Sequence, residues 1–144
     1  MSEAMRRAAS AVFYLVALFY GYGALVHVLN IAGLNGFDWL QAPLKWQILD
    51  ITYLVLDLIV CIGFVLHRRL GVAAFMAAAI SQVFLYTVFR GWIIDVPAAF
   101  AVTPEQESYL TKLVVFHIAS LLLVALSYRA AGRTFFDGRG SEAP

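Results

Sequence analysis

The chain has 144 residues, of which 62% are hydrophobic and 13% are charged, and its formal net charge is +1. Because a soluble domain usually carries about a quarter charged residues, this composition argues against a soluble protein and predicts an integral membrane protein. The single cysteine, Cys61, excludes a disulfide or a dithiol relay within these residues. The small net charge gives no sign of a nucleic-acid partner, and none is expected.

Four apolar segments follow one another along the chain, at 8–31, 46–66, 71–94 and 110–129. Each is long enough to cross about 30 Å of hydrocarbon as a helix that rises about 1.5 Å per residue. The first is longer than the apolar core of a signal peptide, so we expect it to be retained. The sequence therefore predicts an all-α fold, a four-helix transmembrane bundle in one domain over 1–132. A cytosolic tail over 133–144 should either lie at the surface, with Phe135 and Phe136 touching lipid, or be disordered.

The positive charges predict the orientation of this bundle. The HRRLG turn and both chain ends share one side, and the GFDW and TPEQES loops share the other. The arginines of the first side are Arg6, Arg7, Arg68, Arg69, Arg129, Arg133 and Arg139. Since Lys and Arg favour the cytoplasmic side, both termini should be cytosolic. We expect a multi-pass protein of the plasma membrane, which is the inner membrane in a bacterium.

The second segment combines an apolar face with a polar stripe. Trp46, Asp50, Tyr53 and Asp57 fall within about 60° of one another on a helix. Because an ionisable group facing lipid is costly, the stripe should face the interior of the bundle. Asp50 then lies near the outer interface and Asp57 near the midplane. An acid at that depth predicts a functional group, although a structural hydrogen bond or ion pair would also explain it.

The other segments also carry polar groups in their outer halves, at His27, at Gln82, Tyr86 and Arg90, and at His117. Most of them, together with Asp50 and Tyr53, fall about 5–12 Å below the outer boundary, and Asp57 and Gln82 lie deeper. If these faces converge, they line a cavity that opens to the outer side or the outer leaflet. The inner halves of the segments are much more apolar.

The two histidines allow a second interpretation. His27 and His117 lie at matched depth on different helices and could be axial ligands of a haem b iron. With Asp50 they could also form a site of two histidines and one carboxylate for a metal ion. The chain contains neither HExxH nor the Glu-x-x-His pattern of di-iron bundles. Histidines of this kind more often pack or contact a ligand.

The order of these features resembles a known family. YGYGALVH is followed by the loop GLNGFDWLQAPLKW, by a helix with an acid, and by LDLIVCIGFVLHRRLGVAAFMAAA. This pattern is similar to that of DoxX-like four-helix membrane proteins over about residues 8–130. The resemblance implies membrane redox chemistry, as in a subunit of a thiosulfate:quinone oxidoreductase or in complexes linked to oxidative stress. Asp50 and Asp57 occupy the place where many DoxX-like sequences carry an acid.

The leading hypothesis is a redox-associated membrane subunit that binds a quinone or a similar lipophilic ligand. The residues with expected roles are Asp57 and Asp50 for proton exchange, His27 and His117 for hydrogen bonds to the ligand, Tyr53, Tyr86 and Gln82 for positioning it, and Arg90 for steadying an acid or an anionic intermediate. Electrons would come from a partner subunit, and a homo-oligomer is also possible. The alternatives are a haem b protein, a structural subunit held by an Asp57–Arg90 pair, and a small transporter.

Overall fold

The computed structural model describes residues 3–131 and 136, and these residues form an all-α fold with no strand among them. Its long helices are α1 (Glu3–Ile31), α2 (Leu44–Val65), α3 (Arg69–Thr87) and α5 (Pro104–Ala131). The short helix α4 (Arg90–Ile94) and the 3₁₀ turns η1 (Trp39–Gln41) and η2 (Ala98–Phe100) lie in the connections. The predicted fold class is confirmed.

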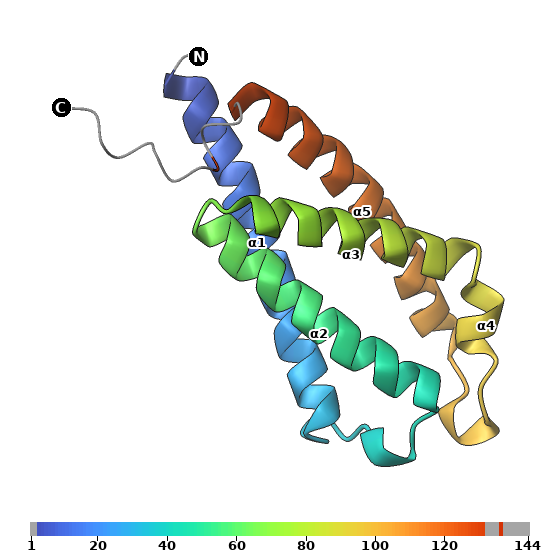
Figure 1. Cartoon of the computed structure of the whole chain (residues 1–144). Coiled ribbons are helices and arrows are strands. Elements are labelled where there is room, and N and C mark those ends of the chain that lie inside the picture. The colour runs from blue at the N-terminus through green and yellow to red at the C-terminus, as the bar shows by residue number, and fades with distance from the viewer. Residues whose placement is uncertain (1–2, 132–135, 137–144) are drawn as a thin grey trace.

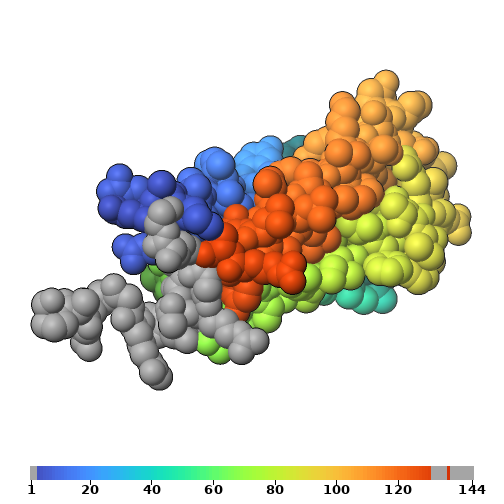
Figure 2. All heavy atoms as spheres, turned by 90° about the horizontal axis from the view of Figure 1, so that it is seen from above, coloured from blue at the N-terminus to red at the C-terminus, as the bar shows by residue number. Residues whose placement is uncertain are grey.

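The four long helices form a closed bundle. α1 packs on α2, α2 on α3, α3 on α5, and α5 on α1 (Figure 1). Figure 2 shows α5 running along one face of the bundle between α1 and α3. All four are long and apolar enough to cross a membrane, and large side chains such as Leu18, Leu122 and Ile62 are exposed on their outward faces. The chain is therefore a multi-pass membrane protein.

The two ends of the bundle differ. One end carries the start of α1, the end of α5 and the tight α2–α3 turn, and we call it the terminal end (Figure 1). The other carries the long connections 32–43 and 88–103, and we call it the loop end. In the predicted orientation the loop end is the outer side.

The third apolar segment is not one continuous helix, which corrects the predicted span of 71–94. α3 ends at Thr87, and Phe89 leaves helical geometry with φ −100° and ψ 14°. The indole N–H of Trp46 on α2 donates to the carbonyl of Ile93 at 3.0 Å. Lys45 donates to the carbonyls of Trp92 and Asp95. These side chains of α2 hold α4 at the loop end, so the chain turns there instead of extending α3.

α5, which corresponds to the fourth predicted span, begins at Pro104, six residues before the predicted start at 110. Thr103 and Gln106 form a reciprocal capping box, in which the Gln106 N–H donates to the Thr103 hydroxyl at 3.3 Å and the Thr103 N–H donates to the Gln106 side chain at 2.8 Å. This pattern, with proline at the first helical position, is a sequence signature of a helix start. The consequence is that Glu105, Gln106 and Tyr109 stand on helical turns rather than on a loop.

The core lies toward the terminal end and is aromatic. Phe13, Phe64 and Phe75 are fully buried there. Phe136 joins them, because it is only 2% exposed and its ring lies 4.8 Å from that of Phe13. The expectation that Phe136 touches lipid is therefore wrong, and Phe135 lies outside the described residues.

Candidate functional site

A cavity of about 640 Å³ opens at the loop end between α1, α2, α3 and α5. This volume is in the range of small-molecule sites, which span about 300–1,000 Å³. Its polar lining comes from His27, Asn30, Asn35, Asp50, Tyr53, Tyr86, Glu105, Gln106 and Tyr109. Its apolar lining comes from Phe37, Trp46, Leu49, Leu85, Ile93, Val102 and Leu110. The wall therefore combines aromatic rings with a few hydrogen-bonding groups, which is the usual composition of a small-molecule site.

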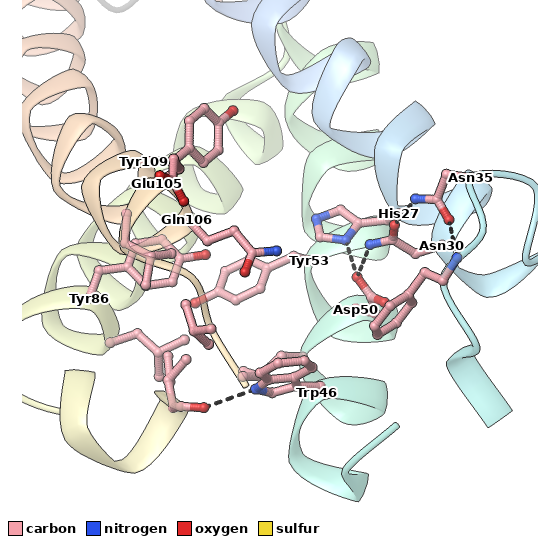
Figure 3. Close-up of a pocket in the computed structure, with 16 residues that line it drawn as sticks. His27, Asn30, Asn35, Trp46, Asp50, Tyr53, Tyr86, Glu105, Gln106 and Tyr109 are labelled. Carbon is pink, nitrogen blue, oxygen red and sulfur yellow. Dashed lines mark hydrogen bonds and ion pairs between the residues drawn. The ribbon is translucent and has the colours of Figure 1, made fainter. Parts of the chain in front are cut away.

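Hydrogen-bonded residues of α1, of the loop that follows it and of α2 form one wall of this cavity (Figure 3). The Nδ1 of His27 and the Oδ1 of Asp50 are 2.6 Å apart, and the Asn30 amide donates to the same oxygen at 3.3 Å. The Asn35 side-chain amide in turn donates to the side-chain Oδ1 of Asn30 at 2.5 Å. His27 and Asn30 reach Asp50 together because residues three apart share one face of a helix. The Asp50 contact orients the imidazole ring.

Asp57 lies behind this wall and does not line the cavity. It is 3% exposed, and its Oδ2 is 3.8 Å from the Nε2 of His27. The side chain packs against Gly23 of α1, where a β-carbon would collide with the carboxylate. His27 therefore stands between two acids, one in the cavity wall and one in the bundle interior.

Tyrosines form the floor and the opposite wall of the cavity. The ring of Tyr53 lies parallel to that of His27 within 20°, with centroids 6.4 Å apart. Its hydroxyl shares a hydrogen bond of 3.0 Å with Ser81, whose hydroxyl also contacts the Ala78 carbonyl at 3.0 Å. Tyr86 of α3 lies opposite it (Figure 3), and Tyr109 of α5 also lines the cavity. Phenol groups at these positions both donate and accept hydrogen bonds.

No lysine or arginine lines the described cavity, because the nearby cations are engaged elsewhere. Lys45 binds the α4 carbonyls and lies 5.2 Å from the centre of the Trp92 ring. Arg90 donates to the Thr111 hydroxyl at 2.9 Å and to the Glu107 carbonyl at 2.7 Å, and it pairs with the Glu107 carboxylate at 3.4 Å. Arg90 thus ties α4 to α5, and the expectation that it steadies Asp50 or Asp57 is not met.

The two histidines do not share a cavity. His117 is 1% exposed, and its Nδ1–H donates to the Leu113 carbonyl of its own helix at 2.6 Å. Its ring packs against those of Phe19, Tyr20 and Phe116, which gives it a packing role. Among the described residues, no group of three His, Cys, Asp or Glu side chains is arranged to hold a metal ion.

The predicted site residues therefore divide into two groups. His27, Asp50, Tyr53 and Tyr86 line the cavity, whereas Asp57, Gln82, Arg90 and His117 do not. The prediction missed five polar lining residues, Asn30, Asn35, Glu105, Gln106 and Tyr109. Glu105, Gln106 and Tyr109 were placed in or at the edge of the last loop, although the Thr103-Pro104 capping signature could have assigned them to a helix.

The arrangement can hold a neutral ring with polar substituents and can exchange a proton with it. The His27–Asp50 pair, Tyr53 and Tyr86 supply donors and acceptors within a largely aromatic wall. Comparison with protein-family models, with curated proteins and with solved structures gives no match to this chain.

Proposed function

We propose that this chain is a DoxX-like subunit of the plasma membrane that binds a quinone in the cavity at the loop end. The observation that carries the proposal is the 2.6 Å contact between His27 and Asp50 in the wall of that cavity. A histidine oriented by a carboxylate is a group that can both donate to a ligand and take its proton. It stands here in a bundle that is itself immersed in lipid, where a quinone is dissolved.

The polar groups of the cavity match the two forms of a quinone. The oxidised ring offers two carbonyl oxygens that accept hydrogen bonds, and the reduced ring offers two hydroxyls that donate. Tyr86 and the Nε2 of His27 can each switch between donor and acceptor, so they can bind both forms. Tyr53 shares its O–H with Ser81 and can accept from the reduced form. The flat rings of Phe37 and Trp46 give the ligand ring apolar surface to pack against.

Protons and electrons reach this ligand by different routes. Reduction of a quinone to a quinol consumes two electrons and two protons. The His27–Asp50 pair handles protons at the ligand oxygen, with His27 in direct contact and Asp50 stabilising the charged imidazolium. The electrons come from a partner subunit. The absence of a cation in the cavity lining fits a neutral ligand better than an anion such as thiosulfate.

The test is mass spectrometry of the lipophilic molecules that co-purify with the protein in mild detergent. Wild type should retain a quinone, and Asp50→Asn should lose most of it because the amide does not hold the imidazole as a carboxylate does. Asp95→Asn is the matched control, since Asp95 is exposed at the end of α4 and outside the cavity lining. Retention of bulk phospholipid alone by all three proteins would contradict the proposal. A visible haem absorption band in the purified protein would contradict it too.

A further inference from the structure

A second polar cluster lies deeper in the bundle than the cavity, and the proposed quinone site does not use it. Tyr20 of α1 is 1% exposed and Asp57 of α2 is 3% exposed. Gly23 is one helical turn after Tyr20, and His27 is one turn after Gly23. Because Asp57 packs against Gly23, it lies beside α1 between the turns that carry Tyr20 and His27.

Two atoms of this cluster lack a hydrogen-bond partner within the described part of the chain, the Tyr20 hydroxyl oxygen and the Asp57 Oδ1. Buried polar atoms are nearly always satisfied by protein or by ordered water, and leaving them unpaired is costly. The two groups are within electrostatic range of one another, and the Tyr53 and Tyr86 phenols are within range of both. Neither atom is hydrogen-bonded to the other, however. One water molecule between them would accept from or donate to Tyr20 and donate to Asp57.

We propose that Tyr20 and Asp57 bind one ordered water molecule, and that this pair is a proton-holding site connected to the cavity through His27. Water has both donors and acceptors, so it can satisfy the phenol and the carboxylate together. The water site stands without the quinone proposal, whereas the use of the protons that it holds rests on that proposal.

The proton transfer is a single balanced step. A His27 imidazolium keeps one N–H on Asp50 through Nδ1 and directs the other, on Nε2, toward Asp57. Transfer of that second proton leaves a neutral imidazole and a neutral Asp57 carboxylic acid. The present Nε2–Oδ2 separation is 3.8 Å, about 1 Å more than direct transfer needs. The same Nε2 serves the ligand and Asp57 in turn, so the His27 ring turns from the ligand toward Asp57 to close this distance.

The direct test is a crystal structure of the full-length, ligand-free protein in lipid at a resolution that shows ordered water. The expected result is a peak within about 3 Å of both the Tyr20 oxygen and Asp57 Oδ1, and its loss in Tyr20→Phe. An empty site would overturn the proposal, and so would a direct Tyr20–Asp57 bond or a cation-like shell of oxygens around the peak. Because the crystallised protein contains no quinone, this result tests the water site whether or not the quinone proposal is correct.

A second measurement needs no crystals. Infrared spectra of hydrated wild-type films should contain an O–H stretching band that shifts when H₂¹⁸O replaces H₂¹⁶O. Tyr20→Phe keeps the ring packing and should abolish this band, whereas the control Tyr14→Phe, at an exposed phenol of the terminal end, should keep it. The protonated acid should give a carboxyl C=O band that is absent from Asp57→Asn. A shifting water band that persists in Tyr20→Phe would place the water elsewhere and overturn the proposal.

Discussion

A close backbone contact joins Gly63 of α2 to Gly71 of α3, and it allows a specific prediction for Gly71→Ala. A β-carbon built on Gly71 would lie 2.6 Å from the Gly63 carbonyl carbon, 2.7 Å from its Cα and 2.9 Å from the Phe64 nitrogen. Non-bonded carbons are comfortable at about 3.5–4.0 Å. Backbone atoms cannot move aside as a flexible side chain can, so α2 and α3 would have to separate by about 1 Å.

Two effects oppose each other in this variant. Alanine favours helix over glycine by about 1 kcal/mol, and overpacking a well-packed contact costs about 1–3 kcal/mol. Separation of the helices would also loosen the contact between Phe64 and Phe75, whose ring centroids are 5.6 Å apart. The clash should therefore dominate, and Gly71→Ala should lower the free energy of unfolding by roughly 1–2 kcal/mol.

The assay is SDS-induced unfolding of the detergent-solubilised protein, followed by circular dichroism. Gly91→Ala is the matched control, because Gly91 is exposed in α4 and a β-carbon there meets nothing within 4 Å. It should leave stability unchanged or raise it slightly. Equal unfolding curves for Gly71→Ala and wild type would refute the backbone contact between α2 and α3.

Three further predictions concern other parts of the chain. Gly23→Ala should displace the Asp57 carboxylate, with a smaller stability loss than Gly71→Ala because a side chain can yield; an unchanged carboxyl infrared band would contradict this. Lys45→Met removes the bonds to backbone carbonyls at α4, including that of Trp92. Limited proteolysis within 95–103 should therefore be faster than in wild type, and equal rates would show that these bonds do not hold α4 in place. Burial lowers the pKa of the His67 imidazole below its usual value of about 6.5. The unfolded chain then binds more protons just below pH 6.5, so stability should fall as the pH drops through that region. This fall should be shallower in His67→Asn, and identical pH profiles would show that another group causes it.

The sequence was sufficient for the fold because the signal for a membrane helix is strong. Long apolar runs, interrupted by loops with Gly, Pro and charge, determine the number and type of helices directly. The polar stripe containing Asp50, Tyr53 and Asp57 was also predicted to face inward, and all three residues are buried.

The site was harder to predict because depth along a helix does not give the contacts of a side chain. His117 lies on the predicted helix but bonds to the backbone of that helix, and Arg90 contacts α5 because the chain leaves helical geometry at Phe89. That break depends on Lys45 and Trp46, which reach α4 across the bundle. Such contacts between distant segments leave no periodic signal in the sequence.

The central claim is that a quinone binds beside His27 and Asp50. The most direct measurement is a titration of purified protein in nanodiscs with a short-chain quinone, followed by quenching of tryptophan fluorescence, since Trp46 lines the cavity. Saturable quenching is expected in wild type and in Asp95→Asn. In His27→Gln the apparent Kd should rise roughly 10-fold or more, which corresponds to the loss of a charge-assisted hydrogen bond of about 1.5–3 kcal/mol. Non-saturable quenching in wild type, or the same Kd in His27→Gln, would contradict the claim.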